Sequence, residues 1–138
     1  MLKLDYAVAS DRGLVRSNNE DSAYAGPYLL ALADGMGGHA AGEIASQLMI
    51  NHLRALDTYP GDNDMLALLG MVADEANAAL AEGIREDATR DGMGTTLTAF
   101  MFNGRELGMC HVGASRAYLL RVGLLAQLPV GATVVLAL

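Results

Sequence analysis

Apolar and polar positions first alternate along the chain and then run together. Alternation over 2–9 predicts a β-strand, and Asp11-Arg12-Gly13 breaks it. We expect a second strand near 22–25, followed by a turn at Gly26-Pro27. The continuous apolar run 28–33 predicts a third strand that is buried on both faces.

The spacing changes to a helical period after a glycine-rich segment, 34–38, which we expect to be a loop. The pattern predicts one helix over 40–56 and a second that Asp62 or Asn63 caps and that ends before 92–94. The buried stripe expected for the first helix is Ile44, Leu48, His52 and Leu56, with Ala45 and Met49 beside it. The stripe expected for the second helix is Leu66, Leu69, Ala73, Ala76, Leu80 and Ile84.

The last part of the chain has the pattern of antiparallel strands. Asn103-Gly104 is a strong hairpin signal, and it joins the predicted strands 95–102 and 105–112. A second hairpin is expected from 115–120 and 124–128. This order of elements indicates an α+β fold with an antiparallel sheet.

Composition narrows the classes of protein and partner. The chain has 138 residues, is 52% apolar and carries a net charge of −7, which is typical of one globular domain. A single Lys and the absence of a basic run argue against nucleic acid as a partner. Cys110 is the only cysteine, and no apolar run is long enough to span a bilayer. We therefore expect no membrane association and a cytoplasmic location.

Two polar clusters could carry chemistry. Glu20 and Asp21 repel each other unless they are exposed or near a cation, although a solvated turn before a strand explains them as well. Asp34 follows a predicted buried strand, and its carboxylate and the carbonyl of Gly35 are ligands that suit Mg²⁺ or Mn²⁺. The alternative is a tight strand-to-helix turn that Asp34 caps. The glycines could also cradle a phosphate, but they match neither a P-loop nor a dinucleotide-binding motif.

Five motifs occur in a fixed order between about residues 9 and 127. They are Ser10-Asp11-Arg12-Gly13, 16–21, 34–39 with Gly42-Glu43, 92–96 and 111–116. Each is weak alone, but together they are specific. With them the chain resembles the type 2C metal-dependent (PPM) serine/threonine phosphatases in their bacterial form. The resemblance implies an antiparallel β-sandwich flanked by helix pairs, in α-β-β-α layers, with a two-metal site at one edge.

The resemblance also implies roles for individual residues. Asp34 would bridge two Mn²⁺ or Mg²⁺ ions, and Gly35 would offer its carbonyl. Glu20 and Asp21 would hold metal-bound waters. Arg16 would bind the substrate phosphate, which its planar guanidinium matches. The implied reaction is hydrolysis of phosphoserine and phosphothreonine in proteins by a metal-activated water, opposing serine/threonine kinases. This hypothesis requires Arg16 and Asp34 to share one cleft.

The sequence departs from the family pattern at several positions that bear on metal binding. Ala114 stands where the family has a metal-binding aspartate, and Met36 where some members have a histidine. The family's two further metal-binding aspartates lie in a C-terminal half that 1–138 does not contain. We therefore expect a single partial domain, the N-terminal half only, with weak metal affinity. The apolar end, 129–138, indicates truncation or else a final core strand.

Two consequences follow from a missing half. Unpaired strand edges and apolar faces favour self-association. The chain could also be a non-catalytic, truncated or pseudophosphatase fragment that acts as a binding module. A regulator phosphatase of the sporulation or stress-response type shares the same fold, and only the substrate would separate it from the leading hypothesis.

Overall fold

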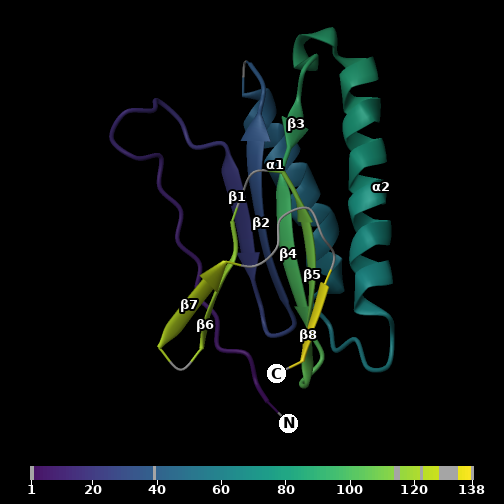
Figure 1. The fold of residues 1–138 in the computed structure, drawn as a ribbon. Coiled ribbons are helices and arrows are strands. Elements are labelled where there is room, and N and C mark those ends of the chain that lie inside the picture. Colours follow the sequence, from purple (N-terminus) through teal and green to yellow (C-terminus); the bar gives the residue numbers. More distant parts are fainter. Residues whose placement is uncertain (1, 39, 114–115, 122, 128–133, 138) are drawn as a thin grey trace.

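The computed structural model describes residues 2–38, 40–113, 116–121, 123–127 and 134–137. Strands and helices alternate in blocks along the chain (Figure 1). The elements are β1 (Asp21–Ala25), β2 (Leu29–Met36), α1 (Ala41–Leu53), the 3₁₀ turn η1 (Arg54–Leu56), α2 (Met65–Glu86), the 3₁₀ turn η2 (Ala88–Arg90), β3 (Gly94–Thr95), β4 (Leu97–Phe102), β5 (Glu106–Val112), β6 (Tyr118–Arg121), β7 (Leu124–Gln127) and β8 (Val134–Ala137).

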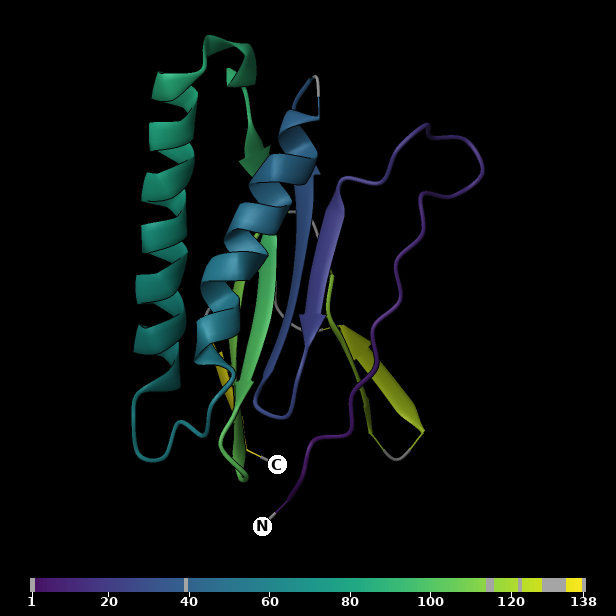
Figure 2. The ribbon, with the colours of Figure 1, turned by 180° about the vertical axis from the view of Figure 1, so that it is seen from behind.

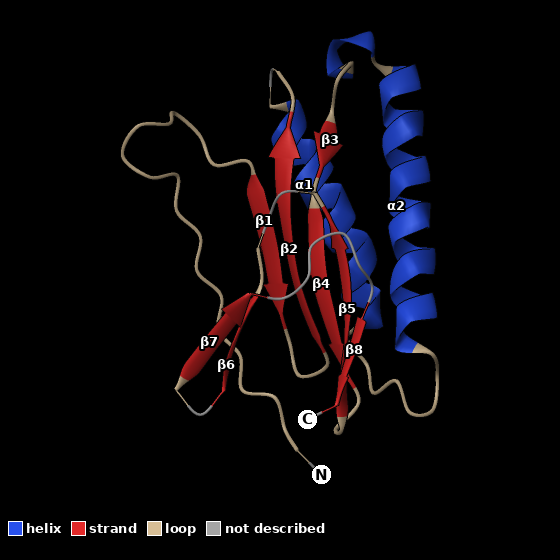
Figure 3. Cartoon of the chain, viewed as in Figure 1, coloured by secondary structure: helices blue, strands red, loops and turns tan. Residues whose placement is uncertain are grey.

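One antiparallel sheet organises the molecule. Its strand order is β1-β2-β4-β5-β8, and β3 pairs with the end of β2. The two long helices cover the same face of this sheet (Figures 1 and 2). β6 and β7 form a separate two-stranded ribbon (Figure 3). The α+β prediction is therefore confirmed, and the described residues contain one of the two expected helix pairs.

The core lies between the sheet and the helices. Alternate residues of β2 point one way in a strand, and Leu29, Ala31 and Ala33 are all buried. Leu53 of α1 and Leu69 of α2 belong to the same apolar cluster. Small side chains on β2 allow the large side chains of the helices to fill the space between the layers.

The predicted strand over 2–9 is wrong. This segment is an extended coil, and Leu2, Tyr6 and Val8 are exposed. Leu2 N–H donates to Gly104 O at 3.2 Å, but 2–9 joins no strand ladder of the sheet. Alternating apolar residues favour a strand only where a neighbouring strand pairs with the backbone and a layer covers one face.

The predicted loop over 34–38 is wrong for its first three residues. Asp34, Gly35 and Met36 continue β2. Asp34 pairs with Asp21 of β1, and the next two residues pair with β3. Backbone pairing on both sides outweighs the low strand propensity of glycine here.

The helices are where the pattern predicts them, and their buried faces agree with the prediction only in part. Leu69, Ala76 and Leu80 of the stripe predicted for α2 are buried, and the other three residues of that stripe are half-buried. In α1 the predicted stripe is only half-buried, whereas Ala45 and Met49 beside it are buried. The buried residues of α1 are Ala41, Gly42, Ala45, Ser46, Met49, Ile50 and Leu53. In α2 the buried residues are Met65, Leu69, Val72, Ala76 and Leu80. The helix cap is Asp64, which accepts from Leu66 N–H at 3.0 Å and Ala67 N–H at 3.2 Å, in place of the expected Asp62 or Asn63.

The two predicted hairpins are confirmed. β4 and β5 pair around Asn103-Gly104, and β6 pairs with β7. Val134–Ala137 forms β8 and pairs with β5, as the alternative of a final strand required. Ala114, Ser115 and Leu128 lie outside the described residues.

Asp57 ties the β1–β2 turn to the end of the first helix. Its carboxylate accepts from Tyr24 OH at 2.5 Å and from Tyr28 N–H at 2.9 Å. A Cβ on Gly26 would stand 2.0 Å from Asp57 Oδ2, so the turn has room for no side chain. The guanidinium of Arg54 lies over the Tyr24 ring, 5.3 Å from its centroid.

Gly26→Ala is therefore expected to lower the melting temperature by roughly 5–10 °C, because the new methyl group displaces Asp57 and breaks both hydrogen bonds. Thermal denaturation followed by circular dichroism measures it. The matched control is Gly70→Ala in α2, where an added Cβ meets no atom within 4 Å. The control should leave the melting temperature unchanged or raise it. Equal shifts in the two variants would contradict the role given to Asp57.

Candidate metal and phosphate site

A polar pocket of about 270 Å³ lies where the segment before β1 passes the end of β2. Four carboxylates and two guanidinium groups line it, together with two amides. The lining residues are Asp11, Arg12, Arg16, Asn18, Asn19, Glu20, Asp21 and Asp34. Arg16 and Asp34 thus line one pocket, as the sequence-based hypothesis requires.

Asp21 and Asp34 are the electrostatic centre of this pocket. They are direct partners in the antiparallel ladder between β1 and β2, so their side chains share one face of the sheet. Burial, and then the adjacent carboxyl group of Asp34, raise the pKa of Asp21, while the positive charge of Arg16 lowers it. Two carboxylates held face to face destabilise a sheet unless a proton or a cation lies between them.

This repulsion predicts a pH dependence of stability. Because the folded-state pKa of Asp21 is raised, its contribution is fully present below the unfolded value of 3.8 and is lost as the pH rises through the folded pKa. In metal-free protein, Asp21→Asn is therefore expected to be more stable than the wild type at neutral pH. That difference should shrink as the pH falls toward 3.8. Urea denaturation at several pH values measures it, with Asp62→Asn as a control that leaves the pair intact.

Glu20 turns away from this pair, toward helix α1. Its carbonyl oxygen accepts from Ser46 Oγ–H at 2.6 Å and from Gly35 N–H at 3.2 Å. Its Oε2 is buried and, among the described residues, has no hydrogen-bond partner. Burying a carboxylate oxygen without a partner costs free energy, and a hard cation is one group that offsets this cost.

Hydrogen bonds with Thr95 and Thr96, which follow η2, hold the backbone of Asp34 in place. Asp34 N–H donates to Thr96 Oγ1 at 3.0 Å, and Thr96 N–H donates to Asp34 O at 2.9 Å. Thr95 Oγ1 also donates to Asp34 O at 3.3 Å. Asp34 does not cap the helix, because the residue at the N-cap of α1 is Ala40. Residues 92–96 form one of the five sequence motifs, to which the sequence alone assigns no function. The hydrogen bonds of Thr95 and Thr96 show that this motif fixes the position of Asp34.

Sequence reasoning missed other residues of the pocket. Arg12 lines it beside Arg16, although the sequence offered only its place in the motif Ser10-Asp11-Arg12-Gly13 as a signal. Asn19 orders the segment by accepting from Asp21 N–H at 3.0 Å and donating to Ser10 Oγ at 2.7 Å. Gly35 is not among the lining residues, because it packs beneath Asp34 against the first turn of α1.

The donors present fit a hard divalent cation. Within the described ranges, no group of three or more His, Cys, Asp or Glu side chains is placed to hold a metal ion by itself. The facing carboxylates of Asp21 and Asp34 and the unpartnered oxygen of Glu20 are nevertheless the oxygen ligands that Mg²⁺ and Mn²⁺ prefer. So few ligands indicate weak binding by these residues alone.

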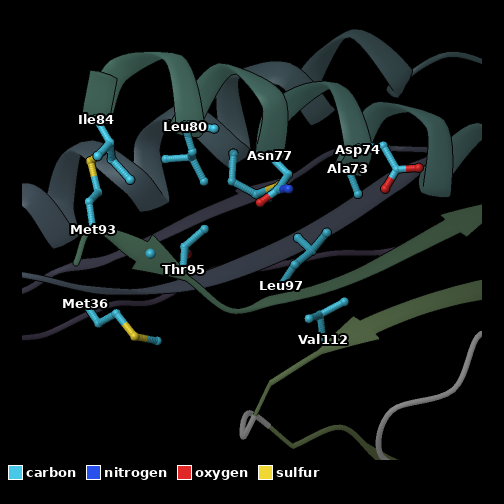
Figure 4. A pocket seen from close by; sticks show the side chains of 13 residues that line it. Met36, Ala73, Asp74, Asn77, Leu80, Ile84, Met93, Thr95, Leu97 and Val112 are labelled. Carbon is cyan, nitrogen blue, oxygen red and sulfur yellow. The ribbon is translucent and has the colours of Figure 1, made fainter. Parts of the chain in front are cut away.

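A second hollow, of about 450 Å³, lies between α2 and the strands β3 to β5 (Figure 4). Leu80 and Ile84 of α2 point toward Leu97 and Met93 across it. Its lining is mainly apolar and Asp74 is its one charged residue among those that the structure describes, so it offers no positive charge for a phosphate and only one carboxylate for a cation. No helix of the described structure has the length and apolar character to cross a membrane.

Known proteins share this fold and these motifs. Residues 9–128 match the family model of protein phosphatase 2C. The serine/threonine protein phosphatase PstP of Mycobacterium tuberculosis is 57% identical over 127 residues, which are 92% of this chain and 25% of PstP. The serine/threonine phosphatase stp of Listeria monocytogenes is 32% identical over 132 residues, 86% of this chain and 51% of its own length.

A solved structure agrees with the fold. The catalytic domain of the serine/threonine protein phosphatase PstP, in complex with two manganese ions, matches with a TM-score of 0.89 and 56% identity, over 92% of this chain and 55% of that one. The chain spans between a quarter and about half of the length of these relatives. The family match covers most of the chain and agrees with the five motifs and with the fold, and the chain therefore belongs to the protein phosphatase 2C family.

Proposed function

We propose that this chain contributes the N-terminal part of a metal-dependent hydrolase that removes phosphate from phosphoserine and phosphothreonine in proteins. One observation carries the proposal. Arg16 lines the same pocket as the Asp21–Asp34 pair, so a phosphate-binding cation and metal-binding carboxylates meet in one hollow. The family and the two manganese ions of the PstP structure support the same chemistry.

The acidic residues hold the metal ions in this proposal. Asp34 would hold both ions, Asp21 and Glu20 would hold their water ligands, and Gly35 would offer its carbonyl. When bound, Mn²⁺ or Mg²⁺ lowers the pKa of water for in-line attack on phosphorus and offsets the charge of the phosphate. The raised pKa of Asp21 fits this role, because a cation between the carboxylates replaces their repulsion with attraction.

The arginines bind the substrate. A guanidinium donates two parallel hydrogen bonds to phosphate oxygens, and Arg16 and Arg12 both line the pocket. The net charge of −7 and the four carboxylates of the pocket repel phosphate, so the two guanidinium groups would act together with bound metal ions to attract a phosphoryl group to the site. The pocket holds about 270 Å³ and is polar, which suits an exposed phosphorylated side chain of a protein better than an apolar small molecule.

The partners in this proposal are phosphorylated proteins, and serine/threonine kinases are the opposing enzymes. We further propose a cytoplasmic location, and self-association through strand edges and apolar side chains that lack a covering layer. The exposed leucines of the β6–β7 ribbon, Leu120, Leu124 and Leu125, are an apolar surface of that kind.

The test is Mn²⁺-dependent release of phosphate from a phosphothreonine peptide, with a phosphotyrosine peptide of the same sequence as the control. Release that requires Mn²⁺ and the phosphothreonine peptide supports the enzyme. A folded protein that binds the phosphothreonine peptide without release favours the binding module. The partial coverage of the relatives motivates that second function, since the catalytic domain of PstP is longer than this chain.

A further inference from the structure

Glu20 occupies the space of a missing side chain in helix α1. A Cβ built on Gly42 would stand 1.6 Å from Glu20 Oε2 and 2.7 Å from its Cδ. No residue other than glycine fits at this position while the carboxylate stays in place. We propose that Gly42 is a positioning residue for the metal site, and that its role is to hold the carboxylate of Glu20. The inference rests on the function proposed above, which gives Glu20 its role toward the metal.

The backbone around Glu20 is held by the next turn of the same helix. Ser46 lies one turn after Gly42 on the same face of α1, and its hydroxyl donates to Glu20 O at 2.6 Å. The side chain and the carbonyl of Glu20 are therefore both held by one face of α1. Rotation of the carboxylate away from the helix would leave the Gly42 position open.

Gly42 also packs directly against the strand that carries Asp34. A Cβ on Gly35 would stand 1.8 Å from Gly42 O and 2.9 Å from Glu20 O. Gly35, Gly42 and Glu20 thus form one close contact between the end of β2, the first turn of α1 and the segment before β1. The two glycines fix how far Glu20 lies from Asp34, because neither backbone can approach so closely with a side chain between them.

The electrostatics of the helix end favour this placement. Ala40, at the N-cap of α1, makes no side-chain capping hydrogen bond. The first N–H groups of a helix and its dipole attract a negative charge. Glu43 supplies one negative charge within the first turn, and the carboxylate of Glu20 adds a second from another part of the chain. Glu20 Oε2 is buried and makes no hydrogen bond among the described residues, so its charge lacks a partner in this position, and a cation is one group that would supply it.

If Gly42 affected only the stability of α1, its replacement by alanine would be favourable and not harmful. Alanine favours helix over glycine, so Gly42→Ala would stabilise α1 if only helix propensity mattered. The contacts of Gly42 predict instead that the methyl group displaces Glu20. Metal affinity, which helix propensity does not change, separates the two roles.

The experiment measures the Mn²⁺ affinity of the wild type, Gly42→Ala and Gly38→Ala by electron paramagnetic resonance of free Mn²⁺. Gly38 precedes the same helix, and a Cβ there meets no atom within 4 Å. We expect Gly42→Ala to weaken Mn²⁺ binding about 10-fold or more, as the loss of a supporting contact does at other metal sites, and Gly38→Ala to bind like the wild type. Glu20→Asp in the Gly42→Ala background should restore part of the affinity, because the shorter side chain leaves room for the methyl group.

The outcomes separate this inference from the proposed function. If the wild type binds no Mn²⁺, the proposed metal site is wrong and the metal role of Gly42 falls with it. If the wild type binds Mn²⁺ and folded Gly42→Ala binds it equally well, only the positioning role is wrong. Should Gly42→Ala not fold, Glu20→Ala in the same chain is expected to restore folding, because it removes the clash. A double variant that stays unfolded would overturn the inference.

Discussion

Asp34→Asn is expected to abolish Mn²⁺ binding and, with it, Mn²⁺-dependent phosphate release. Asp34 contributes half of the facing carboxylate pair, and its backbone is fixed by Thr95 and Thr96. An amide leaves the shape of the site unchanged and removes the charge that a hard cation requires. Loss of a group that supports a ligand costs roughly 10–100-fold in affinity, and we expect loss of the ligand itself to cost at least about 100-fold.

The same variant should become more stable without metal. Asp34→Asn removes the repulsion that, after burial, is the largest cause of the raised pKa of Asp21. Urea denaturation should therefore show higher stability than the wild type in chelator and no further gain when Mn²⁺ is added, whereas Mn²⁺ stabilises the wild type. Asp62→Asn, in a separate polar hollow beside Arg105, is the control and should behave like the wild type. Undiminished Mn²⁺ stabilisation of Asp34→Asn would remove Asp34 from the metal site.

Arg16→Ala is expected to lower kcat/KM for a phosphothreonine peptide by roughly 10–100-fold, because a hydrogen bond to a charged group contributes about 1.5–3 kcal/mol. Mn²⁺ affinity should not fall, since Arg16 carries a positive charge beside the carboxylates. Steady-state kinetics and Mn²⁺ titration measure the two quantities. Arg16→Lys should recover only part of the loss, because an ammonium cannot form the paired hydrogen bonds of a guanidinium.

The control for Arg16→Ala is Arg85→Ala, which removes the same charge from the exposed face of α2, where Arg85 pairs with Glu82. It should leave kcat/KM unchanged. Equal losses in the two variants would mean that net charge, and not a contact with phosphate, directs the substrate. If the chain proves to be a binding module, peptide affinity takes the place of kcat/KM and the expected order of the variants is the same.

Much of the fold could be predicted from local patterns. The helices α1 and α2, the hairpin at Asn103-Gly104 and the hairpin of β6 and β7 follow from periodicity and turn chemistry, which are encoded within a few residues. The coil conformation of 2–9 could not be predicted in this way. The alternation of this segment is that of a strand, but a strand also requires a partner, and no described strand pairs with it.

The burial of individual residues was also beyond the sequence pattern. Periodicity in α1 placed Ile44 and Leu48 on the buried stripe with Ala45 beside it, whereas Ala45 and Ser46 are buried and Ile44 and Leu48 are only half-buried. The reason is that the first turn of α1 lies close to β2, where a Cβ on Gly35 would stand 1.8 Å from Gly42 O, and so close an approach selects small side chains there. Likewise, the sequence pattern predicts only a loop at Gly35 and a weak helix former at Gly42. In the structure, both residues lie where segments that are distant in the chain come into close contact.

The sequence by itself determined the family, the two helices, the paired hairpins and the residues Arg16, Glu20, Asp21, Asp34 and Gly35 as candidates, because motifs and periodicity are local properties. Only the tertiary structure decided how these residues meet. It placed Asp21 opposite Asp34, brought Arg16 and Arg12 to the same pocket and set Glu20 against Gly42. These contacts depend on strand register and on the packing of α1 against β2, which join segments that lie far apart in the chain.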